Sequence, residues 1–98
     1  NSYYIYNVKY KKVHKESLMN SKVLSLDTLQ TGKKGVVMDI VATETERRRF
    51  WDLGLIRGTV VESLHKSPAG DPVAYSVMGA VIALRNHDAG KILVSSNM

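Results

Sequence analysis

The side chains most able to bind a metal or transfer protons are spread too widely along the sequence to form a recognisable site. Three histidines lie in separate segments and share neither helical nor hairpin spacing: His14, His65 and His87. A metal centre needs several converging ligands, each oriented by further hydrogen bonds. His87 with Asp88, or Glu44 with Glu46, could hold a divalent ion only loosely. We therefore predict no metal site and no cofactor, because the ligand spacing does not support transition-metal binding.

Groups suited to covalent or phosphate chemistry are equally sparse. The chain has no cysteine, which excludes a thiolate nucleophile and a thiolate metal site. Neither glycine-rich phosphate-binding pattern, GxxxxGK[ST] or GxGxxG, occurs in it. A chain of 98 residues that folds as a small β-barrel also fills its interior with side chains instead of enclosing a catalytic pocket. We expect no enzymatic activity and no catalytic residues.

The most suggestive local feature is the run Arg47-Arg48-Arg49-Phe50-Trp51. On a helix the three arginines fan around the axis, at about 100° per residue. Phe50 and Leu53 are three residues apart and can face the core together, whereas Trp51 is rotated away. An exposed Arg and Trp surface is typical of interaction hot spots. The alternative is that Trp51 folds over the end of a barrel and the arginines are only solvated.

The elements that must position this run are mainly β-strands. The helix begins with a capping box, Thr43-Glu44-Thr45-Glu46, and Gly54 follows it where a left-handed residue is favoured. Apolar and β-branched runs of strand length surround it. We predict strands over 23–26, 36–41, 59–66, 73–78, 81–84 and 92–94. Five to six short strands with one short α-helix between strands 2 and 3 favour a small, mainly β barrel.

The length of 98 residues fits one small domain. Residues 1–18 contain four lysines and one glutamate, giving 4 − 1 = +3, and residues 19–98 contain ten basic and eight acidic residues, giving +2. We interpret residues 1–18 as a disordered, vector-derived or upstream-translated leader, and 19–98 as the domain. The alternative is a native basic, aromatic arm that contacts a partner, an RNA or an anionic membrane surface. Most of the charge excess lies outside the domain, so we predict no nucleic-acid partner.

An ordered series of motifs through residues 23–94 carries a family resemblance. The central block, residues 48–59, reads RRFWDLGLIRGT. It resembles the R-x-x-L-x-x-x-G-L-x-x-G helix-and-turn signature of the FeoA family. Arg57 stands where proline is common in that family. The flanking matches, in order, are Leu26, Leu29, Gly32, Gly35, Val37, Gly70-Asp71-Pro72, Val77, Gly79, Ala83-Leu84-Arg85, Ala89 and Ile92-Leu93-Val94.

The resemblance implies an SH3-like β-barrel that serves as a cytoplasmic accessory protein of bacterial ferrous iron uptake. The implied partner is a FeoB-like ferrous iron permease with a GTP-binding domain, through which the protein would reach the inner face of the membrane. From side-chain type and helical position we expect the contact surface to comprise Arg47, Arg48, Trp51, Leu55, Ile56 and Arg57. Phe50 and Leu53 would anchor the helix.

Three other roles stay open at this point, one of them a nucleic-acid-binding barrel, whose affinity would fall steeply with salt. The same barrel occurs as the C-terminal domain of DtxR-type metal-dependent repressors, so the chain could be a stand-alone metal-responsive or protein-interaction module. Direct delivery or sensing of a divalent ion would instead require saturable Fe²⁺ binding that depends on His87 or Glu46. The oligomeric state is not indicated by the sequence.

Overall fold

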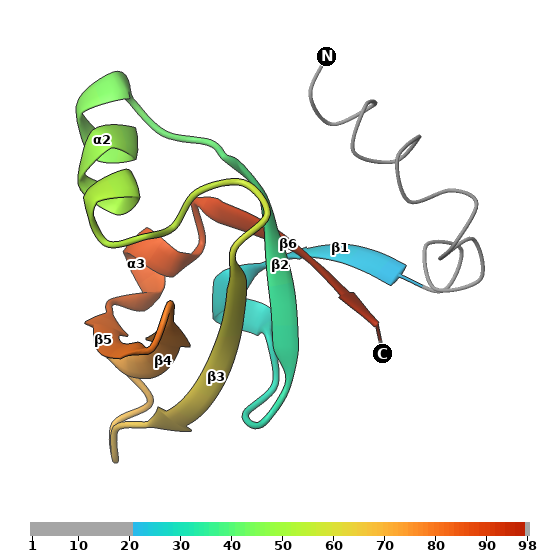
Figure 1. Cartoon of the computed structure of the whole chain (residues 1–98). Helices are drawn as coiled ribbons and strands as arrows, with labels where there is room; N and C mark the ends of the chain where they lie inside the picture. Colours follow the sequence, from blue (N-terminus) through green and yellow to red (C-terminus); the bar gives the residue numbers. More distant parts are fainter. Residues whose placement is uncertain (1–20, 98) are drawn as a thin grey trace.

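The computed structural model describes residues 21–97, which form one curved antiparallel sheet and its helical connections (Figure 1). The elements in chain order are β1 (Ser21–Ser25), the 3-10 helix η1 (Leu26–Thr28), β2 (Lys34–Ile40), α2 (Glu44–Asp52), β3 (Val60–Lys66), β4 (Val73–Val77), β5 (Ala80–Leu84), α3 (Asn86–Ala89) and β6 (Ile92–Asn97). The sheet order is β1-β6-β2-β3-β4-β5. The leader predicted over residues 1–18 lies outside the described residues.

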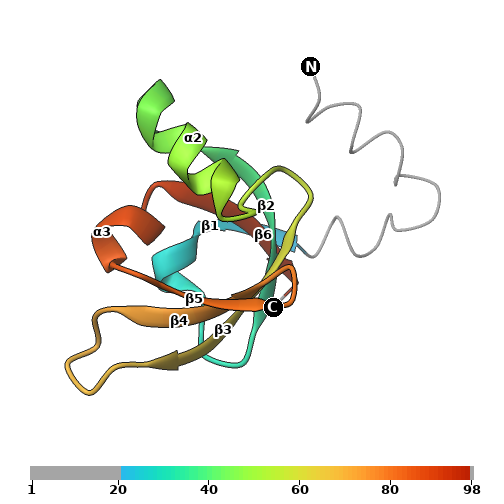
Figure 2. The ribbon, with the colours of Figure 1, turned by 60° about the vertical axis from the view of Figure 1, so that its left-hand side comes forward.

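The sheet is mainly β as predicted, but it is not a closed barrel. Its edge strands are β1 and β5, and no ladder among the described residues pairs them. Each edge strand runs directly into a short helix, η1 after β1 and α3 after β5, and these two helices lie against each other. Figure 2 shows the sheet curving around the interior, with η1 and α3 beside the opening. The space between the edge strands β1 and β5 is therefore filled by the helical turns η1 and α3 and not by strand pairing.

The interior is formed by the inward faces of the strands together with buried residues of the connections. In β4, burial alternates with the period of two that a half-buried strand requires, with Val73, Tyr75 and Val77 inside. The Tyr75 hydroxyl donates to the carbonyl oxygen of Leu26 at 3.4 Å, which ties β4 to η1. Burial, with the nearby charges of Asp27 and Asp71, raises the pKa of Tyr75 to about 12. Tyr75 is therefore a neutral donor throughout the physiological range.

The N-terminus of α2 has the capping box expected from its sequence. The backbone N–H of Glu46 donates to Thr43 Oγ1 at 3.2 Å, and the backbone N–H of Thr43 donates to Glu46 Oε1 at 3.1 Å. Lys91, 45 residues further on, donates from Nζ to Glu46 Oε2. The start of α2 is thus tied to the segment that leads into β6.

This arrangement predicts an acid-sensitive contribution to stability. The hydrogen bond from Lys91, followed by the one from the Thr43 backbone, lowers the pKa of Glu46 from 4.5 to about 2. A carboxylate whose pKa falls on folding stabilises the folded state above its unfolded pKa, and this contribution is lost as the pH falls through the folded value. The wild type should exceed Glu46→Gln in free energy of unfolding. This difference should be largest above pH 4.5 and should decrease as the pH falls towards 2.

Urea denaturation at a series of pH values measures this difference. Glu44→Gln is the matched control, because Glu44 lies in the same helical turn and pairs only with the exposed Arg48. The Glu44→Gln variant should keep the acid sensitivity of the wild type. A pH-independent effect of Glu46→Gln would contradict the assignment.

Two glycines shape the connection from α2 to β3. Gly54 has φ +94° and Gly58 has φ +93°, a left-handed conformation that costs other residues roughly 1–2 kcal/mol. A Cβ on Gly54 would also lie 3.0 Å from Met78 Sδ and 3.3 Å from Val77 Cγ1, whereas one on Gly58 would meet nothing within 4 Å. Met78 is exposed and can move, but Val77 is buried.

Both alanine variants should therefore lose stability, and Gly54→Ala should lose more than Gly58→Ala. Chemical denaturation of the two variants side by side separates backbone strain, which they share, from crowding, which only Gly54→Ala has. Equal losses would show that the contact with the β4–β5 turn carries no cost.

Candidate functional site

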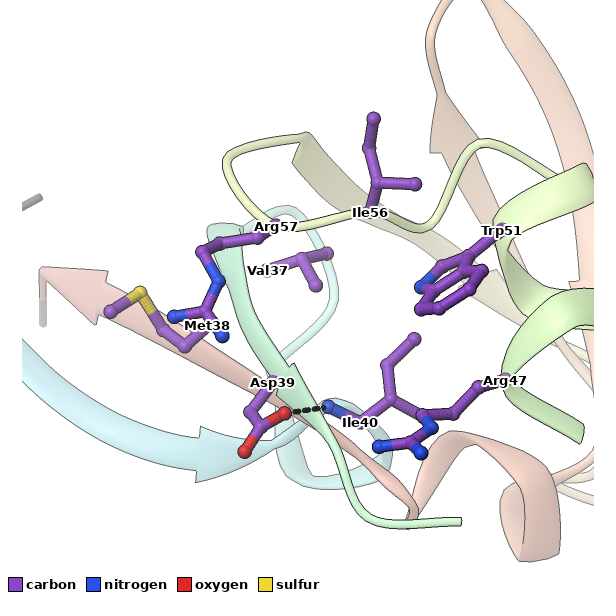
Figure 3. A pocket seen from close by; sticks show the side chains of 8 residues that line it. All are labelled: Val37, Met38, Asp39, Ile40, Arg47, Trp51, Ile56 and Arg57. Carbon is purple, nitrogen blue, oxygen red and sulfur yellow. Dashed lines mark hydrogen bonds between the residues drawn. The ribbon is translucent and has the colours of Figure 1, made fainter. Parts of the chain in front are cut away.

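A groove of about 400 Å³ lies between α2, β2 and the turn that follows α2. This volume is in the range of ligand-binding pockets, about 300–1,000 Å³. Figure 3 shows the side chains that surround it. They are Val37, Met38, Asp39 and Ile40 from β2, Arg47 and Trp51 from α2, and Ile56 and Arg57 from the turn. The groove thus brings together four of the six residues expected at a contact surface.

The floor of the groove is formed by β2. The pairing of β2 with β6 shifts register between Val37 and Asp39, which makes Met38 the extra residue of a bulge. A bulge bends its strand and increases the local twist. Val37, Met38 and Ile40 are all buried, while Asp39 is exposed and its Oδ1 accepts a hydrogen bond from the backbone N–H of Ile40 at 2.8 Å.

One wall is the face of α2 that carries Arg47 and Trp51. These residues are four apart, so their side chains lie on one side of the helix. Phe50, fully buried, is the only buried residue of α2 and holds this helix to the core. Trp51 is 48% exposed. Leu53, expected to share the anchoring role, is instead 40% exposed, because the helix ends there and the chain turns away at Gly54.

The opposite wall is the turn between α2 and β3. The backbone N–H of Gly58 donates to the Val37 carbonyl at 2.8 Å, and that of Val37 donates to the Thr59 carbonyl at 2.9 Å. These bonds hold the turn beside β2, and Ile56 is left 43% exposed. Leu55, expected at the surface, is fully buried, because its backbone N–H bonds back to the Phe50 carbonyl at 3.0 Å and its side chain joins the core.

The arginines of α2 differ in their partners. Arg48 lies 3.6 Å from Glu44 on the solvent side of the helix, outside the groove, and Arg49 lies 3.4 Å from Asp88 of α3. Within residues 21–97, neither Arg47 nor Arg57 forms an ion pair. The Arg47 Nε is buried and makes no hydrogen bond with any described group.

The candidate ligands for a divalent ion do not come together. His65 is in β3 and His87 is in α3, and His14 lies outside the described residues. The Glu46 carboxylate is engaged by Lys91 and Thr43. Among residues 21–97, no cluster of three or more metal-ligating side chains forms.

Sequence reasoning missed the floor of the groove. The run VVMDIV predicts a strand of β-branched residues, and the acidic Asp39 within it marks a face that reaches solvent. Its position opposite Arg47 and Arg57 follows from strand order and from the bulge, which no local pattern indicates.

The comparisons with known proteins agree with this architecture. The model of the family described as "FeoA domain" matches residues 24–96. No curated protein is similar enough in sequence to add to this match. In the part of the chain that the structure describes, no helix is long and apolar enough to cross a membrane.

Three solved structures illustrate the likeness. A FeoA-like protein from Clostridium acetobutylicum is 34% identical with a TM-score of 0.72, the match covering 79% of this chain and 90% of that one. A zinc-complexed FeoA from Stenotrophomonas maltophilia, described as a prokaryotic SH3 domain protein, is 28% identical with a TM-score of 0.64, covering 72% and 88%. A manganese-dependent transcriptional repressor shares the fold alone, at 21% identity and a TM-score of 0.68, over 76% of this chain and 41% of that one.

Proposed function

The chain belongs to the FeoA domain family, and from this premise we propose that it is a non-enzymatic accessory protein of ferrous iron uptake. Its partner would be a FeoB-like permease with a GTP-binding domain. The protein would act in the cytoplasm and reach the inner face of the membrane only through this partner. Binding one conformation of the permease better than another would bias its gating or nucleotide state.

The observation that carries the proposal is the composition of the groove. An exposed tryptophan and an exposed isoleucine flank it, and two arginines without acidic partners among the described residues lie beside them. Tryptophan and arginine are enriched among residues that dominate binding energy at protein interfaces. Arg47, Trp51, Ile56 and Arg57 would make the direct contacts, with Leu55 supporting them from the core.

Arg48 has a smaller part in this proposal than its sequence position suggested. It does not line the groove and is paired with Glu44 on the exposed surface of α2. An exposed pair of this kind contributes little energy. Arg48 would lie at the rim of the docking surface.

Binding of the full chain to the solubilised permease tests the proposal. We expect saturable binding that weakens at higher salt, because charged groups contribute to it. A dependence on a GTP analogue would mean that the state of the GTP-binding domain is sensed. A folded chain that does not bind the permease at either of two salt concentrations would contradict the proposal.

A further inference from the structure

We propose that the groove between α2 and β2 accepts a segment of the partner in which an Asp or Glu side chain lies next to a large apolar side chain. This inference rests on the proposed docking function and specifies its chemistry. The carboxylate would pair with Arg47, and the apolar side chain would lie against Trp51 and Ile56.

Arg47 is the arginine of α2 that is left to receive a carboxylate. Arg48 and Arg49 each have an acidic partner within 4 Å, Glu44 and Asp88, whereas no described carboxylate pairs with Arg47. Its buried Nε has no hydrogen-bond acceptor among residues 21–97. A guanidinium presents its N–H groups as a planar fork that matches the two oxygens of a carboxylate. A carboxylate of a bound Asp or Glu would therefore pair with the guanidinium of Arg47.

The apolar part of the occupant is indicated by the two walls. In Figure 3, Trp51 extends from α2 beside the buried Ile40, and Ile56 lies on the turn that follows α2 with its side chain directed away from Ile40. Trp51 and Ile56 are both partly exposed. An apolar side chain bound against them would leave water itself and would also remove part of their exposed surface from water. A carboxylate alone would leave these walls hydrated.

The charge of the groove favours a foreign acidic segment over a segment of this protein. Arg47 and Arg57 line it against one acidic residue, Asp39, whose Oδ1 already accepts the Ile40 N–H. Residues 1–18 carry a net charge of +3 and the whole chain carries +5. Neither the chain's own basic segment nor a second copy matches the sign of the site.

The intrinsic fluorescence of Trp51 tests this chemistry directly, because it is the only tryptophan in the chain. The full chain is titrated with three peptides, each acetylated and amidated so that Glu is the only acid: one containing Leu-Glu, one Leu-Gln and one Ala-Glu. We expect the Leu-Glu peptide to bind about tenfold more tightly than Leu-Gln, the scale of one charge-assisted hydrogen bond. It should also bind more tightly than Ala-Glu, and added NaCl should reduce only the preference for Glu over Gln.

Arg47→Met and Arg48→Met form the matched pair of variants. Both remove a guanidinium from adjacent positions of one helix and keep an unbranched apolar side chain. Arg47→Met should abolish the preference for Glu over Gln, and Arg48→Met should leave it intact. Equal binding of the Leu-Glu and Leu-Gln peptides, or an effect of Arg48→Met equal to that of Arg47→Met, would overturn the inference. A Trp51 signal that changes on dilution without peptide would also overturn it, because a second copy would then occupy the groove.

Failure of this inference and failure of the docking function are distinguishable. If the permease binds but the peptides do not discriminate, the docking function stands and the carboxylate chemistry is wrong. If the Leu-Glu peptide binds as expected but the permease does not, the chemistry of the groove stands and another partner supplies the segment.

Discussion

Replacing Phe50 with alanine should lower the free energy of unfolding by about 3–5 kcal/mol, the range found for large aromatic side chains removed from a core. Phe50 is fully buried and is the only buried residue of α2. The helix has nine residues and is too short to be stable alone. Phe50 is therefore its main apolar anchor, beside the ion pairs of Glu46 with Lys91 and of Arg49 with Asp88, and the groove wall that α2 carries depends on this ring.

Chemical denaturation of Phe50→Ala and Trp51→Ala gives a matched comparison of two adjacent aromatic residues. Trp51 is half exposed, so Trp51→Ala should cost much less stability. If Phe50→Ala does not fold, Phe50→Leu, which keeps most of the buried volume, should still show a loss larger than that of Trp51→Ala. Similar losses for the buried and exposed positions would contradict the anchoring role of Phe50.

Trp51→Ala should instead weaken binding to the permease, by about 30-fold or more, which corresponds to about 2 kcal/mol for an interface hot spot. The reason is that Trp51 forms the apolar wall of the groove beside Arg47. Combining Trp51→Ala with Arg47→Met should cost less than the sum of the single effects, because both side chains contact the same segment.

Surface plasmon resonance with the permease in a lipid nanodisc measures this loss. Val81→Ala is the control, since Val81 is an exposed apolar residue on β5 that does not line the groove. Its binding should match that of the wild type. A Trp51→Ala variant that is folded and binds normally would place the docking surface elsewhere.

Features that depend on near neighbours in the chain could be predicted from the sequence. The spacing of Thr43 and Glu46 predicted the capping box, and the structure contains both of its hydrogen bonds. Gly54 was expected to take a left-handed conformation just past the helix, and its φ is +94°. A strand was predicted over 73–78, and β4 spans Val73–Val77. In each case the determining interactions lie within a few residues.

Features that depend on distant segments could not be predicted in this way. The insertion of β6 between β1 and β2 and the open edge between β1 and β5 are set by packing across the whole chain. The ion pair of Lys91 with Glu46 joins residues 45 positions apart. A closed barrel was expected because strand count alone does not reveal that η1 and α3 fill the gap.

In the candidate site, too, side-chain types could be predicted from the sequence, whereas burial and spatial arrangement could not. Arg47, Trp51, Ile56 and Arg57 were selected by side-chain type, and the fold places all four around one groove. The i, i+4 spacing of Arg47 and Trp51 could have identified their common face. Leu55 could not be distinguished from Ile56 by type, because the turn backbone decides which of the two is buried.

The most direct test of the central claim uses the full chain labelled with 5-fluorotryptophan, which introduces one fluorine, at Trp51. ¹⁹F NMR is recorded while unlabelled permease in nanodiscs is added, and again after an excess of unlabelled chain. If α2 and the following turn dock on the permease, the resonance should shift or broaden with saturation, and the excess chain should restore it. An unchanged resonance under conditions where binding is measured independently would show that the permease contacts a different face.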